Sequence, residues 1–339
     1  MRHLRLIPKP KQGELALLTR IRDRAAKVPK RGLRLGIGDD CALVQPKQNE
    51  ELAVTTDLSI AGRHFRLDWH SPDAVGHRTL ARGLSDLAAM GARPLAAFLS
   101  LGLPSNLARP KGPQPAWIDR FLDGFLALAE KYDTPLAGGD LAESSLAVAD
   151  IVLVGAVPRG KALLRCGAKP GDLVYVTGAL GGAAAGLAQL DKKARKSRPR
   201  SDSTDLNDSL ARHLYPQPRI VQGLFLLRRN LATAALDLSD GLSTDLAHLC
   251  SESGVGVAID SASLPIHPAA TMQQALHGGE DYELIFTAHP HARLPRAIAG
   301  VPISCIGRIV PRRRARTQIT LLTAAGSQPL EPAGWEHFS

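Results

Sequence analysis

Six short segments of the sequence place acidic residues beside glycine, serine, threonine or another acid. They read GIGDD (36–40), TTD (55–57), LSDLAAMGA (84–92), GGD (138–140), LDLSDG (236–241) and GGEDYE (278–283). The chain as a whole is basic, with a formal net charge of +10, so composition alone does not account for these clusters. Oxygen ligands beside small residues suit a hard cation such as Mg²⁺, which commonly holds phosphates in enzymes. The pattern therefore favours Mg²⁺-dependent phosphoryl transfer.

Each motif on its own also has an ordinary structural explanation. Asp57 at the end of an apolar run is most simply a turn or cap residue, and GIGDD suits a plain turn. Ser239 or Asp240 can cap the helix that follows, although the same geometry presents backbone N–H groups to a phosphate. The acids of GGEDYE can form a surface turn, but two glycines and an aromatic neighbour favour a binding site.

Helical periodicity places Asp86 on the polar side of its predicted helix, together with Arg78 and Arg82. Taken alone, this spacing predicts a solvated face with an Arg82–Asp86 pair four residues apart. Only the wider series of acidic motifs favours a ligand role for Asp86. The sequence contains no nucleophile–base arrangement, and the glycine-rich run 178–186 is not a phosphate-binding P-loop because no Gly-Lys-Ser/Thr follows.

The composition narrows the class of protein. At 339 residues, with 44% hydrophobic content, the chain is typical of a globular protein of two domains. No apolar run has the length that a bilayer requires, and no secretory signal is present, so we expect no membrane association. The four cysteines are far apart and lack the spacing of a zinc site, which indicates a reducing cytoplasm.

Two basic stretches, KKARKSRPR (192–200) and RRRAR (312–316), hold much of the positive charge. Solvated surface loops are the simplest interpretation. The sequence argues against nucleic-acid binding, because aromatic residues make up only 4% and none alternate with these stretches. Steering of an anionic substrate by the overall positive field is a third interpretation.

The elements that must position the motifs follow from hydrophobic periodicity. We expect helices over 14–25, 72–90, 115–132, 182–190, 218–230 and 242–251, and strands over 52–56, 95–103, 151–157, 173–177, 255–259, 282–287 and 303–309. Ser71 and Pro72 should cap and open the second helix. The polar stretch 191–208 is predicted to be a mobile insertion. Without a strict alternation of strand and helix, the pattern favours an α+β fold over a doubly wound sheet.

In this order, the motifs resemble those of the thiamine-monophosphate kinase family, within the AIR-synthase-like ATP-binding superfamily. The resemblance covers nearly the whole chain and is most specific at GIGDDCAL (36–43), GRHF (62–65), LSDLAAMGA (84–92), DLSDGL (237–242) and GGEDYEL (278–284). It implies an α+β fold of two AIR-synthase-like domains. The N-terminal domain (1–158) would bind ATP and Mg²⁺ and form a dimer through a mixed sheet or half-barrel. The C-terminal domain (159–339) would be α/β layered.

The resemblance also implies a reaction, in which ATP phosphorylates thiamine monophosphate to thiamine diphosphate by direct in-line transfer in a cytoplasmic homodimer. No general base is expected, because the attacking phosphate oxygen is largely deprotonated near neutral pH. Several Mg²⁺ ions would be held by Asp40, Thr55, Thr56, Asp57, Asp86, Asp140, Asp237 and Asp240. ATP would contact Gly139, Asp140, Arg165 and Ser239, and the thiamine end would contact His64, Glu280 and Trp335, whose indole could stack on a thiamine ring.

Some positions depart from the family pattern. Leu141 and Ala142 stand where threonines are usual, and Gly83 stands where an asparagine is usual. These changes keep open a degenerate, non-catalytic nucleotide-binding protein. Another ATP-dependent synthase of the superfamily is a second alternative, although GRHF and the GWEHF tail (334–338) resemble the kinase branch. A nucleic-acid-binding module that uses the basic stretches is a third.

Overall fold

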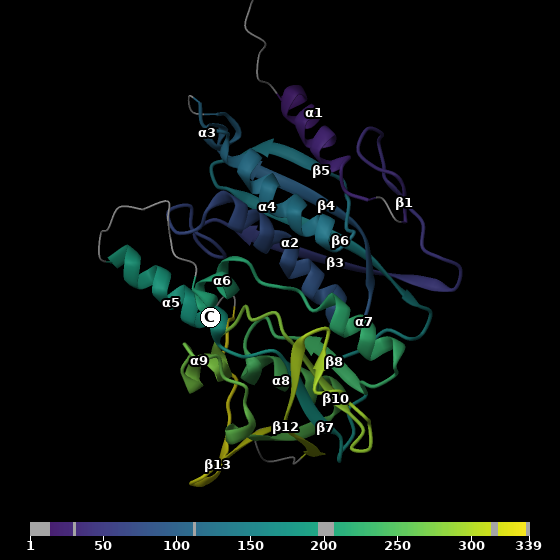
Figure 1. Cartoon of the computed structure of the whole chain (residues 1–339), viewed down its shortest axis with the longest axis vertical. Helices are drawn as coiled ribbons and strands as arrows, with labels where there is room; N and C mark the ends of the chain where they lie inside the picture. The colour runs from purple at the N-terminus through teal and green to yellow at the C-terminus, as the bar shows by residue number, and fades with distance from the viewer. Residues whose placement is uncertain (1–13, 30–31, 111–112, 196–206, 313–317, 337–339) are drawn as a thin grey trace, which may run out of the picture.

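The computed structural model describes residues 14–29, 32–110, 113–195, 207–312 and 318–336 (Figure 1). The N-terminal half contains α1 (Glu14–Ala25), β1 (Leu33–Leu35), β2 (Leu43–Val44), β3 (Glu50–Ile60), α2 (Pro72–Ala89), β4 (Arg93–Leu103), α3 (Ser105–Ala108), α4 (Trp117–Lys131), β5 (Leu136–Glu143) and β6 (Val148–Pro158). The C-terminal half contains β7 (Leu173–Thr177), α5 (Gly182–Arg195), α6 (Asp208–Leu214), α7 (Ile220–Arg228), β8 (Ala234–Asp237), α8 (Leu242–Ser253), β9 (Val255–Asp260), η1 (Ser261–Ser263), α9 (Met272–His277), β10 (Leu284–Ala288), β11 (Ala297–Ile298), β12 (Val301–Pro311), β13 (Ile319–Thr323) and β14 (Gly326–Pro329).

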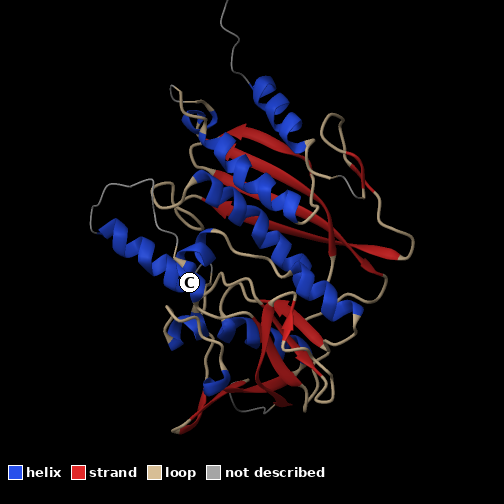
Figure 2. Ribbon diagram, viewed as in Figure 1, coloured by secondary structure: helices blue, strands red, loops and turns tan. Residues whose placement is uncertain are grey.

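Each half is built on its own mixed sheet, and the two sheets lie in the upper and lower parts of Figure 2. In the N-terminal sheet the strand order is β3-β6-β4-β5, antiparallel except for the parallel pair β4 and β5. The order in the C-terminal sheet is β14-β13-β9-β12-β7-β10-β8, with β11 paired to β12. The mixed sheets confirm the predicted α+β class, whereas the division at residue 158 remains a prediction.

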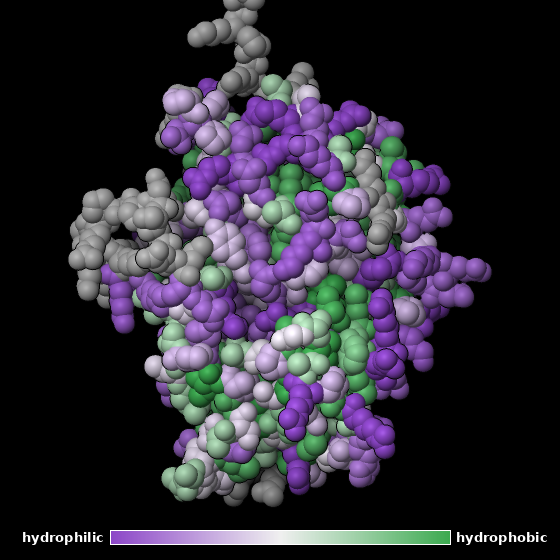
Figure 3. All heavy atoms as spheres, viewed as in Figure 1, coloured by the Kyte–Doolittle hydropathy of each residue, from purple (hydrophilic) through white to green (hydrophobic). Residues whose placement is uncertain are grey.

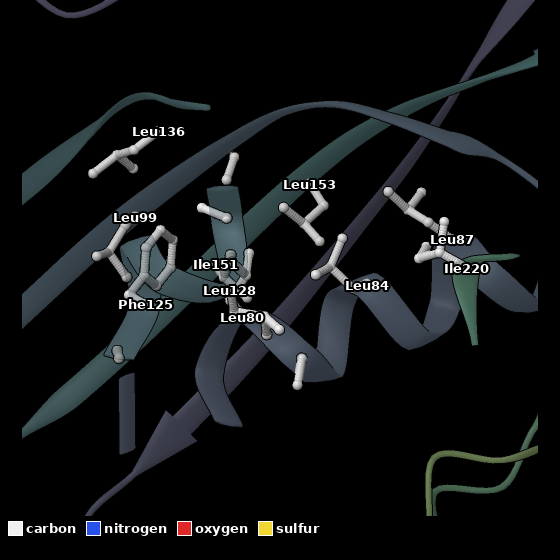
Figure 4. Close-up of a cluster of buried hydrophobic side chains, with 14 of the residues drawn as sticks. Leu80, Leu84, Leu87, Leu99, Phe125, Leu128, Leu136, Ile151, Leu153 and Ile220 are labelled. Carbon is white, nitrogen blue, oxygen red and sulfur yellow. The ribbon is translucent and has the colours of Figure 1, made fainter. Parts of the chain in front are cut away.

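Helices α2 and α4 cover one face of the N-terminal sheet. Leu80, Leu84 and Leu87 of α2 are fully buried, and Figure 4 shows them beside Ile151 and Leu153 of β6. Burying side chains of this size contributes roughly 1.5–3 kcal/mol each. The core anchored by α2 therefore fixes the position of the polar residues on the same helix.

Local sequence explains how α2 begins, and two glycines explain how closely it is enclosed. Ser71 accepts a hydrogen bond from the backbone of Ala74, and Pro72 is the first helical residue, as predicted. A Cβ atom on Gly76 would lie 1.9 Å from a carbonyl oxygen of α4, and one on Gly124 would lie 1.8 Å from a carbonyl oxygen of α2. The two glycines therefore allow the helix backbones to touch.

The two halves meet through an apolar contact. Helix α7 of the C-terminal half lies against α2, and its Ile220 and Leu226 belong to the same buried cluster as the α2 leucines. Figure 3 shows polar side chains over most of one face of the molecule, with hydrophobic ones gathered near α7. A second core lies within the C-terminal sheet around Val257, Ile285 and Ile306.

Several expected elements need correction. Strand β5 and helix α6 were not predicted, and the strand expected over 282–287 begins only at Leu284. Helix α5 continues to Arg195 into the expected insertion, whose residues 196–206 lie outside the described part, as do residues 313–316 of the second basic stretch.

In the described residues, no helix is long and apolar enough to cross a membrane. All four cysteines are free thiols.

Candidate active site

A cavity of about 880 Å³ lies between the two halves of the molecule. Its wall combines β3 and α2 from the N-terminal half with α5, the turn after β8 and the loop before β10 from the C-terminal half. Most of the site residues expected from the sequence lie in this wall: Thr56, Asp57, His64, Asp86, Asp237, Ser239, Asp240, Glu280 and Trp335. Side chains from opposite ends of the chain therefore share one hollow.

Asp57 enters the wall from β3, where alternate side chains point toward α2. Arg82 of α2 holds the Asp57 carboxylate with a two-pronged contact, Nε to Oδ2 at 2.9 Å and Nη2 to Oδ1 at 2.6 Å. Burial raises the pKa of Asp57 to about 6, although Arg82 opposes the shift. Asp57 is thus a desolvated carboxylate whose charge is balanced by one arginine.

Asp86 is not on a solvated face. The expected Arg82–Asp86 pair is wrong, because Arg82 turns to Asp57 and Asp86 instead accepts a hydrogen bond from the Thr55 hydroxyl. Periodicity failed here because α2 is enclosed on more than one side, by α4, the sheet and β8. Burial, followed by the charge of Asp237, raises the pKa of Asp86 to about 6.

Asp237 is an acidic residue of the C-terminal half that lies close to Asp86. It ends β8, is 4% exposed, and accepts a hydrogen bond of 2.6 Å from Ser85 of α2. Burial raises its pKa, while Arg165 and the Ser85 hydroxyl oppose the shift. Arg165 is exposed and outside the cavity wall, yet its charge lowers the pKa of both Asp86 and Asp237. A positive group therefore lies near the two acids at the boundary of the domains.

The turn after β8 is shaped by its backbone. Gly241, with a φ of +118°, is the N-cap of α8, so a side-chain cap by Ser239 or Asp240 is not what forms. Asp245 in the first turn of α8 accepts the N–H groups of Asp240 and Gly241 at 3.2 and 3.1 Å. Trp335 donates its backbone N–H to the carbonyl of Asp240 at 3.0 Å. This bond places the C-terminal tail at the cavity.

The three acids of GGEDYE point in separate directions and do not form a surface turn. Glu280 faces the cavity, where Arg78 donates to its Oε1 at 2.5 Å. Asp281 accepts the N–H groups of Gly181 and Ala183 at the start of α5. Glu283 is enclosed by Thr177 and Arg219. The loop itself is strained, because Glu280 and Tyr282 have φ values of +68° and +50°.

Sequence reasoning missed a pair of histidines in the wall. His70 and His213 are buried and their Nε2 atoms lie 3.0 Å apart, while the Nδ1 atom of His213 lies 3.5 Å from Oε2 of Glu280. Burial lowers the pKa of His213 well below its ordinary value, so His213 is neutral. The expected His64 accepts the N–H of Ile60 at 3.0 Å and lines the cavity. No local signal could have indicated the His70–His213 pair.

Besides Arg165 and Thr55, three expected site residues lie outside the cavity wall. Asp40 is exposed in the loop after β1, and Gly139 and Asp140 are exposed on β5. Strand β5 forms one edge of the N-terminal sheet, and β3, which carries Asp57, forms the other. The roles expected for these residues remain predictions. Thr55 is not in the wall but reaches it through its bond to Asp86.

The acids suit a hard cation that is also bound by other ligands. Among the described residues, no group of three or more His, Cys, Asp or Glu side chains is arranged as a complete metal cage. Mg²⁺ usually takes one or two carboxylates and completes its shell with water and substrate phosphates. Asp57, Asp86 and Asp237 have oxygen donors, burial and raised pKa values, so a divalent cation would stabilise their charged forms.

Comparison with known proteins identifies the family. Residues 38–158 match the AIR synthase related protein N-terminal domain, and residues 169–320 match the corresponding C-terminal domain. Thiamine-monophosphate kinase from Escherichia coli K12 is 42% identical over an alignment that covers 96% of this chain and 98% of the relative. The chain belongs to the thiamine-monophosphate kinase family.

Solved structures support the same family. The thiamine-monophosphate kinase from Stenotrophomonas maltophilia K279a is 39% identical, with a TM-score of 0.77, and covers 91% of this chain and 96% of its own. A structure of AaThiL complexed with AMPPCP and TMP is 30% identical, with a TM-score of 0.72, and covers 100% of both chains. Membership of the kinase family argues against the alternative that the chain is another ATP-dependent synthase of the superfamily.

Proposed function

We propose that this chain transfers the terminal phosphoryl group of ATP to the phosphate of thiamine monophosphate, giving thiamine diphosphate and ADP. The observation that best supports this function is the shared cavity, whose wall contains acidic residues of both halves together with Trp335. A member of the same family, AaThiL, has been solved with AMPPCP and TMP, an ATP analogue and a substrate. The cavity of about 880 Å³ is large enough for ligands of this size.

Positioning and electrostatics would supply most of the catalysis. The acceptor is a phosphate oxygen that is already largely ionised, so the transfer needs alignment and charge neutralisation but no strong base. Mg²⁺, when bound, would neutralise the phosphates and bring donor and acceptor into line. Asp57, Asp86, Asp237 and Asp240 would hold the cations, with Thr55 and Thr56 beside them.

The two substrates would occupy different parts of the wall. Ser239, in the turn between β8 and α8, and Arg165, close to the domain boundary, would contact the nucleotide. His64, Glu280 and Trp335 would contact thiamine monophosphate, which has two flat rings, one of them the positively charged thiazolium. Trp335 is 50% exposed and offers an aromatic face, and Glu280 offers a carboxylate.

We also propose a homodimer formed by the N-terminal sheet. The face of β3 that points away from α2 carries Leu52, Val54 and Leu58, which are 48%, 62% and 44% exposed. A second copy could cover this apolar face. In such a dimer, Asp40, Gly139 and Asp140 of one copy would complete the nucleotide site of the other. The free, largely exposed cysteines fit a reducing compartment, and we propose the cytoplasm.

The dimer can be tested by light scattering. We expect the unaltered protein to have the mass of a dimer, and Val54→Lys together with Leu58→Lys to yield a monomer with reduced kinase activity. Leu146→Lys is the matched control, because Leu146 is equally exposed outside β3 and should leave the mass unchanged. A monomeric unaltered protein with full activity would contradict this part of the proposal.

The reaction itself has a direct assay. Purified protein is incubated with ATP, Mg²⁺ and thiamine monophosphate, and thiamine diphosphate is separated by chromatography. We expect product that requires all three components. A folded dimer that binds nucleotide but forms no thiamine diphosphate would instead identify a non-catalytic member, the alternative raised by Leu141 and Ala142. Leu141 packs against the N-terminal core and Ala142 is exposed on β5.

A further inference from the structure

Arg82 holds a special position among the charged groups of the cavity. It lies on α2 one turn before Asp86, and both residues line the cavity together with Asp57. Its guanidinium contacts both oxygens of Asp57, at 2.6 and 2.9 Å, and its Nη1 atom lies 3.5 Å from the Ser59 hydroxyl. Planar, two-pronged pairing of this kind is the strongest arrangement available to an arginine and a carboxylate.

The Arg82–Asp57 pair is well shielded from water, which strengthens the electrostatic attraction between the two side chains. The side chains of Arg82 and Asp57 are 17% and 19% exposed, which limits screening by solvent. Burial lowers the pKa of Arg82, but the carboxylates of Asp57 and Glu280 favour the positive charge and raise that pKa. Arg82 is therefore a fixed cation within a wall of carboxylates.

This arrangement has a consequence for cation binding. Both Asp57 oxygens are engaged by Arg82, so a divalent ion that uses Asp57 must displace the guanidinium or share the carboxylate with it. In either case the ion is brought close to a positive charge, which disfavours its binding. Nucleotide phosphates would compensate that charge, since they are the usual partners of both arginine and Mg²⁺.

We propose that Arg82 is a positioning residue that competes with the divalent cation for Asp57, so that the site takes up the cation effectively only together with nucleotide phosphates. The proposal rests on the proposed function, because it assumes that Asp57 is a cation ligand. Its structural alternative is a simple ion pair that joins β3 to α2. That alternative predicts a loss of stability when Arg82 is replaced, but no gain in cation affinity.

The deciding experiment measures Mn²⁺ binding by electron paramagnetic resonance of the free ion, in the absence of ATP and thiamine monophosphate. The measurement is made near pH 8.5, above the pKa of about 6 of Asp57, so that protons compete little. We expect Arg82→Met to bind Mn²⁺ about threefold to tenfold more tightly than the unaltered protein. Adding AMPPCP should reduce this difference.

Two further variants keep the test decisive. Arg93→Met removes a comparable, partly buried arginine from Glu50 outside the cavity and should leave Mn²⁺ affinity unchanged. Arg82→Lys keeps the charge but loses the two-pronged contact, and should bind Mn²⁺ slightly more tightly even if Arg82→Met does not fold. Unchanged, weaker or undetectable Mn²⁺ binding in the folded Arg82 variants would overturn the proposal. The kinase assay of the unaltered protein tests the proposed function separately.

Discussion

The two walls of the cavity use their acidic residues differently. On the N-terminal wall, Asp57 and Asp86 come from separate motifs, yet both face the cavity, and burial raises the pKa of each to about 6. In the C-terminal half, the three acids of one motif, GGEDYE, point to three different places. Glu280 faces the cavity, Asp281 binds the start of α5, and Glu283 is enclosed within the fold. Acids that cluster in sequence therefore do not cluster in space.

The partners of each acid explain its part in the molecule. Asp86 is contacted by a threonine hydroxyl and Asp57 by one arginine, partners that a cation could replace without unfolding the chain. Asp281 instead satisfies backbone N–H groups, and Glu283, directly before β10, pairs with Arg219. Removing those acids would leave buried donors unpaired. We therefore expect loss of activity from one set and loss of stability from the other.

Replacing a cavity acid should have the largest effect. Asp86→Asn keeps the size of the side chain but removes the charge that would hold a cation, and we expect turnover to fall about a thousandfold. Thermal unfolding should show an intact fold. The measurement is steady-state formation of thiamine diphosphate, with Asp260→Asn at the N-cap of η1, outside the cavity wall, as control. Activity within tenfold of the unaltered protein would remove Asp86 from the site.

Replacing an enclosed acid should affect stability. Glu283→Ala leaves Arg219 without its carboxylate partner in a site where Glu283 is fully buried, and we expect a loss of about 3 kcal/mol in the free energy of unfolding. Chemical denaturation measures this loss. Turnover per folded molecule should remain within a few-fold. If Glu283→Ala lost activity but kept the stability of the unaltered protein, Glu283 would belong with the acids that are needed for activity.

Trp335 tests the substrate end of the C-terminal wall with a smaller effect. Trp335→Ala removes an aromatic face, and we expect the KM for thiamine monophosphate to rise about tenfold, the order of magnitude for loss of one stacking partner. The KM for ATP should not change. Trp335→Phe should recover most of the affinity. A rise in the KM for ATP alone would reassign the tail to the nucleotide.

The smallest effect concerns pH. The pKa of Asp86 is raised from 3.8 to about 6 in the fold, so its stabilising contribution is complete below pH 3.8 and is lost as pH rises through 6. Without cation or nucleotide, Asp86→Asn should therefore be more stable than the unaltered protein above pH 6. The full shift corresponds to about 3 kcal/mol, which the partial exposure of Asp86 reduces to about 1–2 kcal/mol. Urea denaturation across this range gives the difference. A difference that is independent of pH would show that Asp86 is not desolvated.

The sequence predicted what depends on local pattern. The cap at Ser71 and the periodic helices were confirmed, and most of the site residues expected from the acidic motifs lie in the cavity wall. The burial of Asp86 was misjudged, because it depends on the contacts of α2 with β3 and with β8 of the other half, which helical periodicity does not reveal. Nothing local could predict the His70–His213 contact, whose partners are 143 residues apart.

The central claim is that carboxylates of both halves hold divalent cations that bind the nucleotide phosphates. A crystal structure of the protein with Mn²⁺, AMPPCP and thiamine monophosphate tests it most directly, because anomalous scattering locates the metal. We predict Mn²⁺ at about 2.2 Å from carboxylate oxygens of Asp57, Asp86 or Asp237 and from a phosphate oxygen. Mn²⁺ bound to the phosphates with none of these three carboxylates in its coordination shell would contradict the account.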